Sequence, residues 1–89
     1  MLSVRVRWLD RELLFRASAN IRTDKATVQL GELLNVPEGM MAGLRLSHSG
    51  LQLEPQLTLR ANRVPYGASL ILSLDRQYSV STHQRNRKL

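Results

Sequence analysis

The stretch that decides the fold spans residues 43–74, GLRLSHSGLQLEPQLTLRANRVPYGASLILSL. Leucines alternate with polar residues near its start and near its end, a period typical of strands that bury one face. Ser49-Gly50 and Pro65-Tyr66-Gly67 are turn sequences that separate these segments. The predicted segments are, in order, a strand through Leu44 and Leu46, a tight turn, a short strand through 51–53, an irregular crossing through 57–59 and a last strand through Leu70, Leu72 and Leu74.

The residues before this stretch predict a hairpin. Residues 2–8 alternate strictly, with Arg5 and Arg7 on the polar side, which indicates a half-buried strand. Residues 13–19 predict the returning strand, with Phe15 toward the core and Arg16 on the same side as the other two arginines. The polar segment between them, LDRE over 9–12, has the length of a hairpin loop.

Residues 20–37 change to the period of an amphipathic helix. The apolar stripe falls on Ala26, Leu30, Leu33 and Leu34. Asn20 or Thr23 is expected to cap the start of this helix, and Pro37 is expected to end it. The following segment, EGMMA over 38–42, is expected to be a loop whose two methionines close the end of the core.

The length and composition predict one small domain with an aliphatic core. The chain has 89 residues, no cysteine and one tryptophan, so disulfides, thiolate zinc sites and cysteine nucleophiles are excluded. It contains neither the apolar stretch of a secretion signal nor an apolar run of the roughly 20 residues that cross a bilayer. We therefore expect a cytoplasmic protein without a membrane span, with the nucleus as the alternative compartment.

The order of these elements and several short motifs resemble ubiquitin. The matching motifs, in order and spacing, are Arg45-Leu46, Gly50-x-Gln52-Leu53-Glu54, Thr58-Leu59, Asn62-x-Val64 and Ser69-Leu70-x-Leu72. The resemblance covers residues 2–74. It implies an α+β, ubiquitin-like β-grasp fold, in which a mixed four- to five-stranded sheet carries one amphipathic helix on one face. The expected domain is 1–75, followed by a basic, flexible C-terminal tail over 76–89.

The resemblance also implies which residues form the core. These are Val4, Val6, Leu13, Phe15, Ala26, Leu30, Val36, Leu46, Leu53, Leu59, Val64, Leu70 and Leu72.

Two departures from ubiquitin bear on function. Conjugation of ubiquitin requires a C-terminal Gly-Gly, and no Gly-Gly occurs in this sequence, so covalent conjugation is not expected. The apolar recognition patch of ubiquitin is built around an Ile, a His and a Val, and the matching positions here are Ser47, Ile71 and Ser73. A partner that binds the ubiquitin patch through apolar contacts would find most of those contacts missing in this chain.

Arginines on the outer face of the predicted sheet form the candidate site. All but two of the 13 basic residues are arginine, and the net charge is +6. Arginine binds carboxylates bidentately, so we expect a protein partner with an acidic surface. The predicted partner-binding residues are Arg5, Arg7, Trp8, Leu14, Arg16, Arg45, Ser47, Ile71 and Ser73. The alternative is that the arginines are solvated residues whose stems cover the strands.

The sequence favours other functions less. A nucleic-acid partner is less favoured, because sheets that bind single strands interleave aromatic residues and this face has none in its middle. His48 and His83 stand alone and the carboxylates are scattered, so no enzyme, cofactor or metal site is predicted. A small subunit of a larger enzyme or secretion complex is the remaining alternative, since the chain is similar in size to the ubiquitin-like proteins of bacterial type VII secretion.

Overall fold

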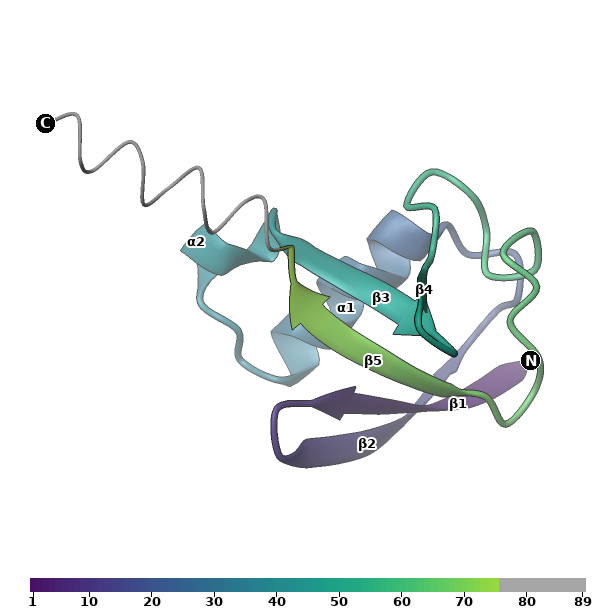
Figure 1. The fold of residues 1–89 in the computed structure, drawn as a ribbon, viewed down its shortest axis with the longest axis horizontal. Coiled ribbons are helices and arrows are strands. Elements are labelled where there is room, and N and C mark those ends of the chain that lie inside the picture. Colours follow the sequence, from purple (N-terminus) through teal and green to yellow (C-terminus); the bar gives the residue numbers. More distant parts are fainter. Residues whose placement is uncertain (76–89) are drawn as a thin grey trace, which may run out of the picture.

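A computed structural model describes residues 1–75, and the tail predicted over 76–89 lies outside them. Five strands, one long helix and one short helix make up this part of the chain (Figure 1). Their bounds are β1 (Leu2–Trp8), β2 (Arg11–Ala17), α1 (Thr23–Leu33), α2 (Glu38–Met41), β3 (Leu44–His48), β4 (Leu51–Gln52) and β5 (Ser69–Leu74).

The strands form one mixed sheet in the order β2-β1-β5-β3-β4. The central pair, β1 and β5, is parallel, and every other neighbouring pair is antiparallel. Figure 1 shows α1 lying across one face of this sheet. The predicted architecture, a mixed sheet with one amphipathic helix on one face, is confirmed.

The core lies between the sheet and α1 and is aliphatic apart from Phe15. Every predicted core residue is buried except Leu13, which is half-buried and packs against the cluster. The core also includes five residues outside that set, of which Leu34 belongs to the predicted helical stripe: Leu2, Ala17, Leu34, Leu44 and Ala68. The alternation of the leucines in β3 and β5 therefore positions the buried face as the sequence predicts.

The β1–β2 hairpin turns more tightly than predicted. The ladder runs without a break from Leu2↔Ala17 to Trp8↔Arg11, so the connection is the two residues Leu9-Asp10. The expected four-residue loop is wrong, and Glu12 belongs to β2. The backbone of Leu9 has φ 57°, a left-handed conformation that favours glycine and that lets the strands reverse in two residues.

The start of α1 is held by backbone groups from a distant loop rather than by a side-chain cap. The sequence predicted a cap by Asn20 or Thr23, and this prediction is wrong. The N-cap residue is Arg22, which makes no side-chain cap bond. The N–H of Thr23 donates to the Leu57 carbonyl at 2.8 Å, and the N–H of Asp24 donates to the Pro55 carbonyl at 2.9 Å. These carbonyls satisfy donors that a cap usually satisfies.

A single asparagine side chain fixes this loop against the helix. Asn62 Oδ1 accepts from the N–H of Glu54 at 3.0 Å, while Nδ2 donates to the Glu54 carbonyl at 3.0 Å. Nδ2 also donates to the hydroxyl of the buried Thr23 at 2.9 Å. The loop therefore holds the first turn of α1 through both backbone and side-chain contacts.

The end of α1 is a Schellman motif centred on Asn35. The N–H of Val36 donates to the Gly31 carbonyl at 2.9 Å and that of Asn35 donates to the Glu32 carbonyl at 3.2 Å, with Asn35 at φ 56°. The helix thus ends before Pro37 acts on it, contrary to the prediction. Leu33, expected in the buried stripe, is 61% exposed, whereas Leu34 is buried.

The segment predicted as a loop over 38–42 contains α2, which packs close to α1. A Cβ atom on Gly31 would overlap with Met41 Sδ and would lie 3.0 Å from Leu44 Cδ1, so glycine permits this approach. Met41 is half-buried against the core, as expected of a methionine that closes its end, but Met40 is exposed. Only one of the two methionines therefore has the predicted position.

Candidate functional site

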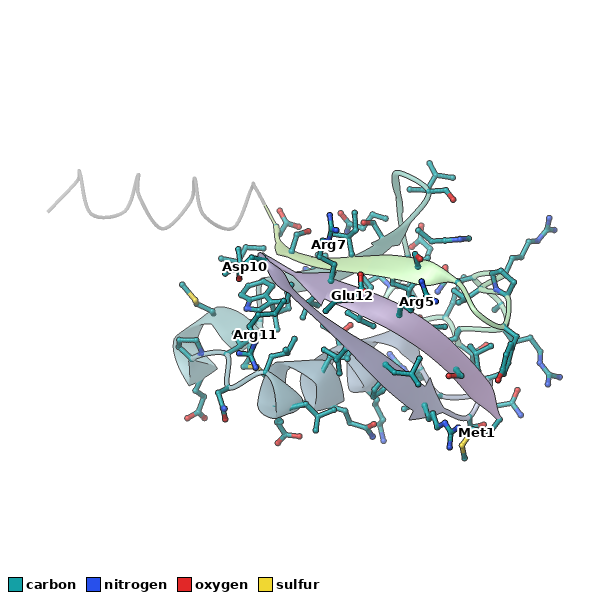
Figure 2. The ribbon with its side chains drawn as sticks, turned by 90° about the horizontal axis from the view of Figure 1, so that it is seen from below. Met1, Arg5, Arg7, Asp10, Arg11 and Glu12 are labelled. Atoms are coloured by element: carbon teal, nitrogen blue, oxygen red, sulfur yellow. The ribbon has the colours of Figure 1, made fainter. Side chains whose placement is uncertain are left out.

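The outer face of the sheet, opposite α1, brings three arginines together with two exposed apolar side chains. In the strand register, Arg7 lies between Glu12 on β2 and Ile71 on β5. Arg5, two residues earlier on β1, lies between Leu14 and Ser69. Side chains in register on neighbouring strands share a face, about 5 Å apart. Figure 2 shows Arg5, Arg7 and Glu12 over the strands of the hairpin.

The arginines of the hairpin are not used to hold the fold together. Within residues 1–75, no side-chain hydrogen bond or ion pair engages Arg5, Arg7 or Arg16. All three are exposed, and they project from a regular ladder rather than from a loop. Their guanidinium groups are therefore available to a partner, on backbone that is held in place by both neighbouring strands.

Two apolar side chains flank the arginines. Leu14 is 61% exposed and Ile71 is 51% exposed, and they lie on the strands on either side of β1. Ser47 and Ser73 share the same face, in register with Ile71 and Arg45 on the neighbouring strands. The matching patch of ubiquitin is thus reduced here to one apolar residue, as the sequence comparison indicated, while Leu14 supplies apolar surface on the other side of the arginines.

Arg45, a predicted partner-binding residue, forms hydrogen bonds and an ion pair within its own chain. Its Nη1 donates to the carbonyls of Leu44 at 2.7 Å and Ala42 at 3.1 Å, and its Nε lies 3.6 Å from Asp75 Oδ2. These contacts hold the end of β5 to the start of β3. We therefore assign Arg45 a structural role at the margin of the face.

Trp8 does not lie on the outer face. Its register partners are Arg11 and Leu72, and the side chain is half-buried against the core on the side of α1. In Figure 2, Arg11, the partner of Trp8 on β2, likewise lies toward the helices. The prediction that Trp8 contributes to an outer binding surface is corrected accordingly.

Glu12 is a member of the face that the sequence did not identify. It was assigned to a loop, but the two-residue turn makes it the direct partner of Arg7 in the ladder. A carboxylate therefore lies beside one of the three arginines. The charge of the face is less uniform than predicted, and Arg5 and Arg16 are its least compensated cations.

A shallow hollow of about 230 Å³ lies at one corner of this face. Met1, Ser3, Arg16 and Tyr66 line it. Tyr66 is exposed and is the only aromatic residue among those lining the hollow. The middle of the face, around Arg5 and Arg7, has no aromatic side chain in register with it among residues 1–75.

No candidate for catalysis or metal binding emerges from the described part of the chain. Among residues 1–75, no three His, Asp or Glu side chains are grouped so that they could hold a metal ion. His48 lies half-buried at the end of β3, and His83 falls outside the described residues. Within 1–75, none of the helices combines the length and the apolar character that crossing a membrane requires.

Comparison with known proteins identifies the fold. No protein-family model matches the sequence, and no curated protein matches it. The structure is similar to the ubiquitin-like domain of the Arabidopsis thaliana protein At2g32350, with a TM-score of 0.71, 14% identity and coverage of 82% of this chain and 76% of that one. It is also similar to the N-terminal ubiquitin-like domain of the 4931431F19Rik protein, with a TM-score of 0.72, 18% identity and coverage of 82% and 73%. The predicted ubiquitin-like β-grasp fold is confirmed.

Proposed function

We propose that this chain is a ubiquitin-like interaction module that binds an acidic protein surface through the outer face of its sheet. In this proposal it acts by binding, without catalysis and without covalent conjugation. One observation carries the proposal: Arg5, Arg7 and Arg16 have no internal partner in residues 1–75, yet they stand on a rigid sheet. Leu14 and Ile71 flank them.

The chemistry of this face favours carboxylates on a protein. Arginine forks pair with carboxylates bidentately, and such pairs set the orientation and the association rate of a complex. Leu14 and Ile71 supply apolar area that becomes buried on docking, which is the part of an interface that contributes most to affinity. A bound single-stranded nucleic acid would instead need aromatic platforms along its path.

The test is a paired charge reversal. We expect R5E/R7E to weaken binding to an acidic protein partner by about tenfold or more, because two cations of the interface become anions. The matched control is R60E/R63E, which makes the same change in net charge at two exposed arginines outside the sheet. We expect acidic protein partners to be captured by the wild-type chain and by the control, but not by R5E/R7E.

The same pair of variants separates a protein partner from a nucleic acid. Polynucleotide binding driven by net charge would fall equally in both variants and would weaken steeply with salt. Equal loss in both variants for every captured partner would therefore contradict a role for the outer face. Thermal unfolding of each variant, measured beside the wild type, checks that the fold is retained.

A further inference from the structure

The strand β2 is an open edge of the sheet. Within residues 1–75 it stands first in the strand order and has β1 as its only sheet neighbour, and Figure 1 shows it along the margin of the sheet. β2 has seven residues without proline, glycine or a bulge, since its register with β1 is unbroken. Natural edge strands are usually short, bulged or interrupted, because an unpaired edge is a template for another strand. This one has none of these features.

The backbone groups that face this edge can be identified. The N–H of Arg5 donates to the Ala68 carbonyl at 2.9 Å, so the polar groups of Arg5 point toward β5. Leu14 is the antiparallel partner of Arg5, and in such a pair the backbone groups of the two residues point away from each other. The N–H and C=O of Leu14 therefore face the open edge. Those of Glu12 and Arg16, two residues away on either side, do the same.

The side chains along this edge are complementary to themselves. Residues 12–16 read Glu-Leu-Leu-Phe-Arg, with Leu14 at the centre. If a second copy of β2 pairs antiparallel about Leu14, Glu12 of each copy lies opposite Arg16 of the other. Leu14 then lies opposite its own counterpart, and the half-buried Leu13 lies opposite Phe15. A shift of the centre to residue 13 puts Glu12 opposite Leu14, and a shift to residue 15 puts Arg16 opposite Leu14, so the Glu12–Arg16 pairing is lost in both.

We propose that β2 pairs with β2 of a second copy of this chain, so that the two sheets join into one in a two-fold symmetric dimer. Leu14 occupies the two-fold axis, and a Glu12–Arg16 ion pair lies on each side of it. Each of these residue pairs exchanges two backbone hydrogen bonds, since all of them present their polar groups to the edge. Leu14 and Arg16 belong both to the pairing and to the binding face proposed above, whereas Arg5, Arg7 and Ile71 take no part in the pairing. R5E/R7E therefore tests partner binding without altering the paired strand.

The size of the contact predicts a reversible dimer. An interface formed by one strand edge lies below the roughly 1,200 Å² that stable complexes bury, so a dissociation constant between about 10 µM and 1 mM is expected. Sedimentation velocity over this concentration range should show an exchanging monomer and dimer. The protein to measure is the wild-type chain with all 89 residues.

Disulfide trapping tests the register. The chain has no cysteine, so L14C introduces the only thiol. In a hydrogen-bonded antiparallel pair the Cα atoms lie about 5.5 Å apart, which is within the range of a disulfide. We expect L14C to cross-link to itself on mild oxidation. R16C alone should not cross-link, whereas a mixture of R16C and E12C should.

Charge exchange tests the ion pairs. E12R places two arginines opposite each other at both ends of the interface, and R16E places two glutamates there, so each variant alone should dimerise at least about tenfold more weakly. In a mixture of the two variants every arginine faces a glutamate, and the heterodimer should form. Residues 12 and 16 are both exposed, as is residue 14 of the cross-linking test, so the core is unchanged. A wild-type chain that stays monomeric to about 1 mM, or cross-linking of R16C as efficient as that of L14C, overturns the proposal.

Discussion

Asn62 shows how one side chain can hold the loop whose carbonyls satisfy the start of a helix. Its amide offers an acceptor and two donors, and it uses them on the backbone of Glu54 and on the hydroxyl of Thr23. A hydroxyl or carboxylate at this position would supply fewer of these groups. The residue that stabilises the start of α1 is therefore far from it in sequence.

We expect N62A to lower the free energy of unfolding by about 1–2 kcal/mol. The substitution removes several hydrogen bonds and leaves the buried hydroxyl of Thr23 without its donor. Urea denaturation measures the change. The matched control is N20A, at an exposed position whose side chain makes no hydrogen bond within residues 1–75. Equal stability of the two variants would contradict the assigned role of Asn62.

Gly31 illustrates a residue whose local preference and packing role oppose each other. Alanine at this position would favour the helix by up to about 1 kcal/mol, but its Cβ would overlap with Met41 Sδ. We expect G31A to destabilise the protein by about 1 kcal/mol, because both Met41 and Leu44 must move.

Two comparisons test this explanation by thermal unfolding. In an M41A background, G31A should become neutral or stabilising, because the overlapping atoms are gone. G39A, at an exposed glycine whose added Cβ would meet nothing within 4 Å, should not lower the melting temperature. If G31A is destabilising to the same extent with and without Met41, the close approach of α2 is not the cause.

At the scale of elements, the β1–β2 hairpin carries an unfavourable residue in its turn. Leu9 adopts φ 57° although it is 75% exposed and contributes little packing. L9G should therefore stabilise the protein by about 1 kcal/mol, since a left-handed conformation costs a leucine roughly that much. L51G makes the same substitution at a leucine of β4 that is 74% exposed, and should be destabilising. Urea denaturation measures both changes in the free energy of unfolding. If L9G and L51G change it in the same direction, the explanation is wrong.

The elements of the second half of the chain could be predicted because alternation alone specifies them. Leucines at every second residue identify β3 and β5, and the turn at Ser49-Gly50 is confirmed by positive φ at both residues. The start of α1 could not be predicted, because the carbonyls that satisfy it come from Pro55 and Leu57, about thirty residues away in the sequence. Contacts of that range leave no local pattern.

The assignment of residues to the outer face was correct where it followed the two-residue period of a strand and wrong where it departed from that period. Alternation places Arg5, Arg7 and Leu14 outward, as the register has them. The same alternation joins Trp8 to Val4 and Val6 on the buried side, so its inclusion in the face contradicted the pattern. Glu12 was missed because the length of the turn depends on the backbone of Leu9, whose conformation its residue type disfavours.

At the scale of the whole molecule, the two faces differ in charge. The helices α1 and α2 carry three carboxylates and one lysine, while the opposite face of the sheet carries the unpaired arginines of the hairpin. Such a separation orients a protein as it approaches a charged partner. An acidic partner would therefore meet the outer face first, even before contacts form.

The proposed dimer would double this effect. The two-fold axis through Leu14 is perpendicular to the joined sheet, so both outer faces point to the same side. Two arginine faces presented in one plane bind a repeated or extended acidic surface more strongly than one, without any new contact. Dimerisation through the edge of β2 would thus also increase the affinity of the outer face for such an acidic partner.

The parallel pairing of β1 with β5 has a consequence for how the protein is made. Of the described strands β1 is synthesised first and β5 last, and the two are central neighbours, so the sheet cannot close until residues 69–74 have been synthesised. The hairpins β1–β2 and β3–β4 would each be marginal alone. Folding therefore waits for the final strand and then involves the whole domain, and a chain stalled before Ser69 exposes the inner edges of both hairpins to chaperones and proteases.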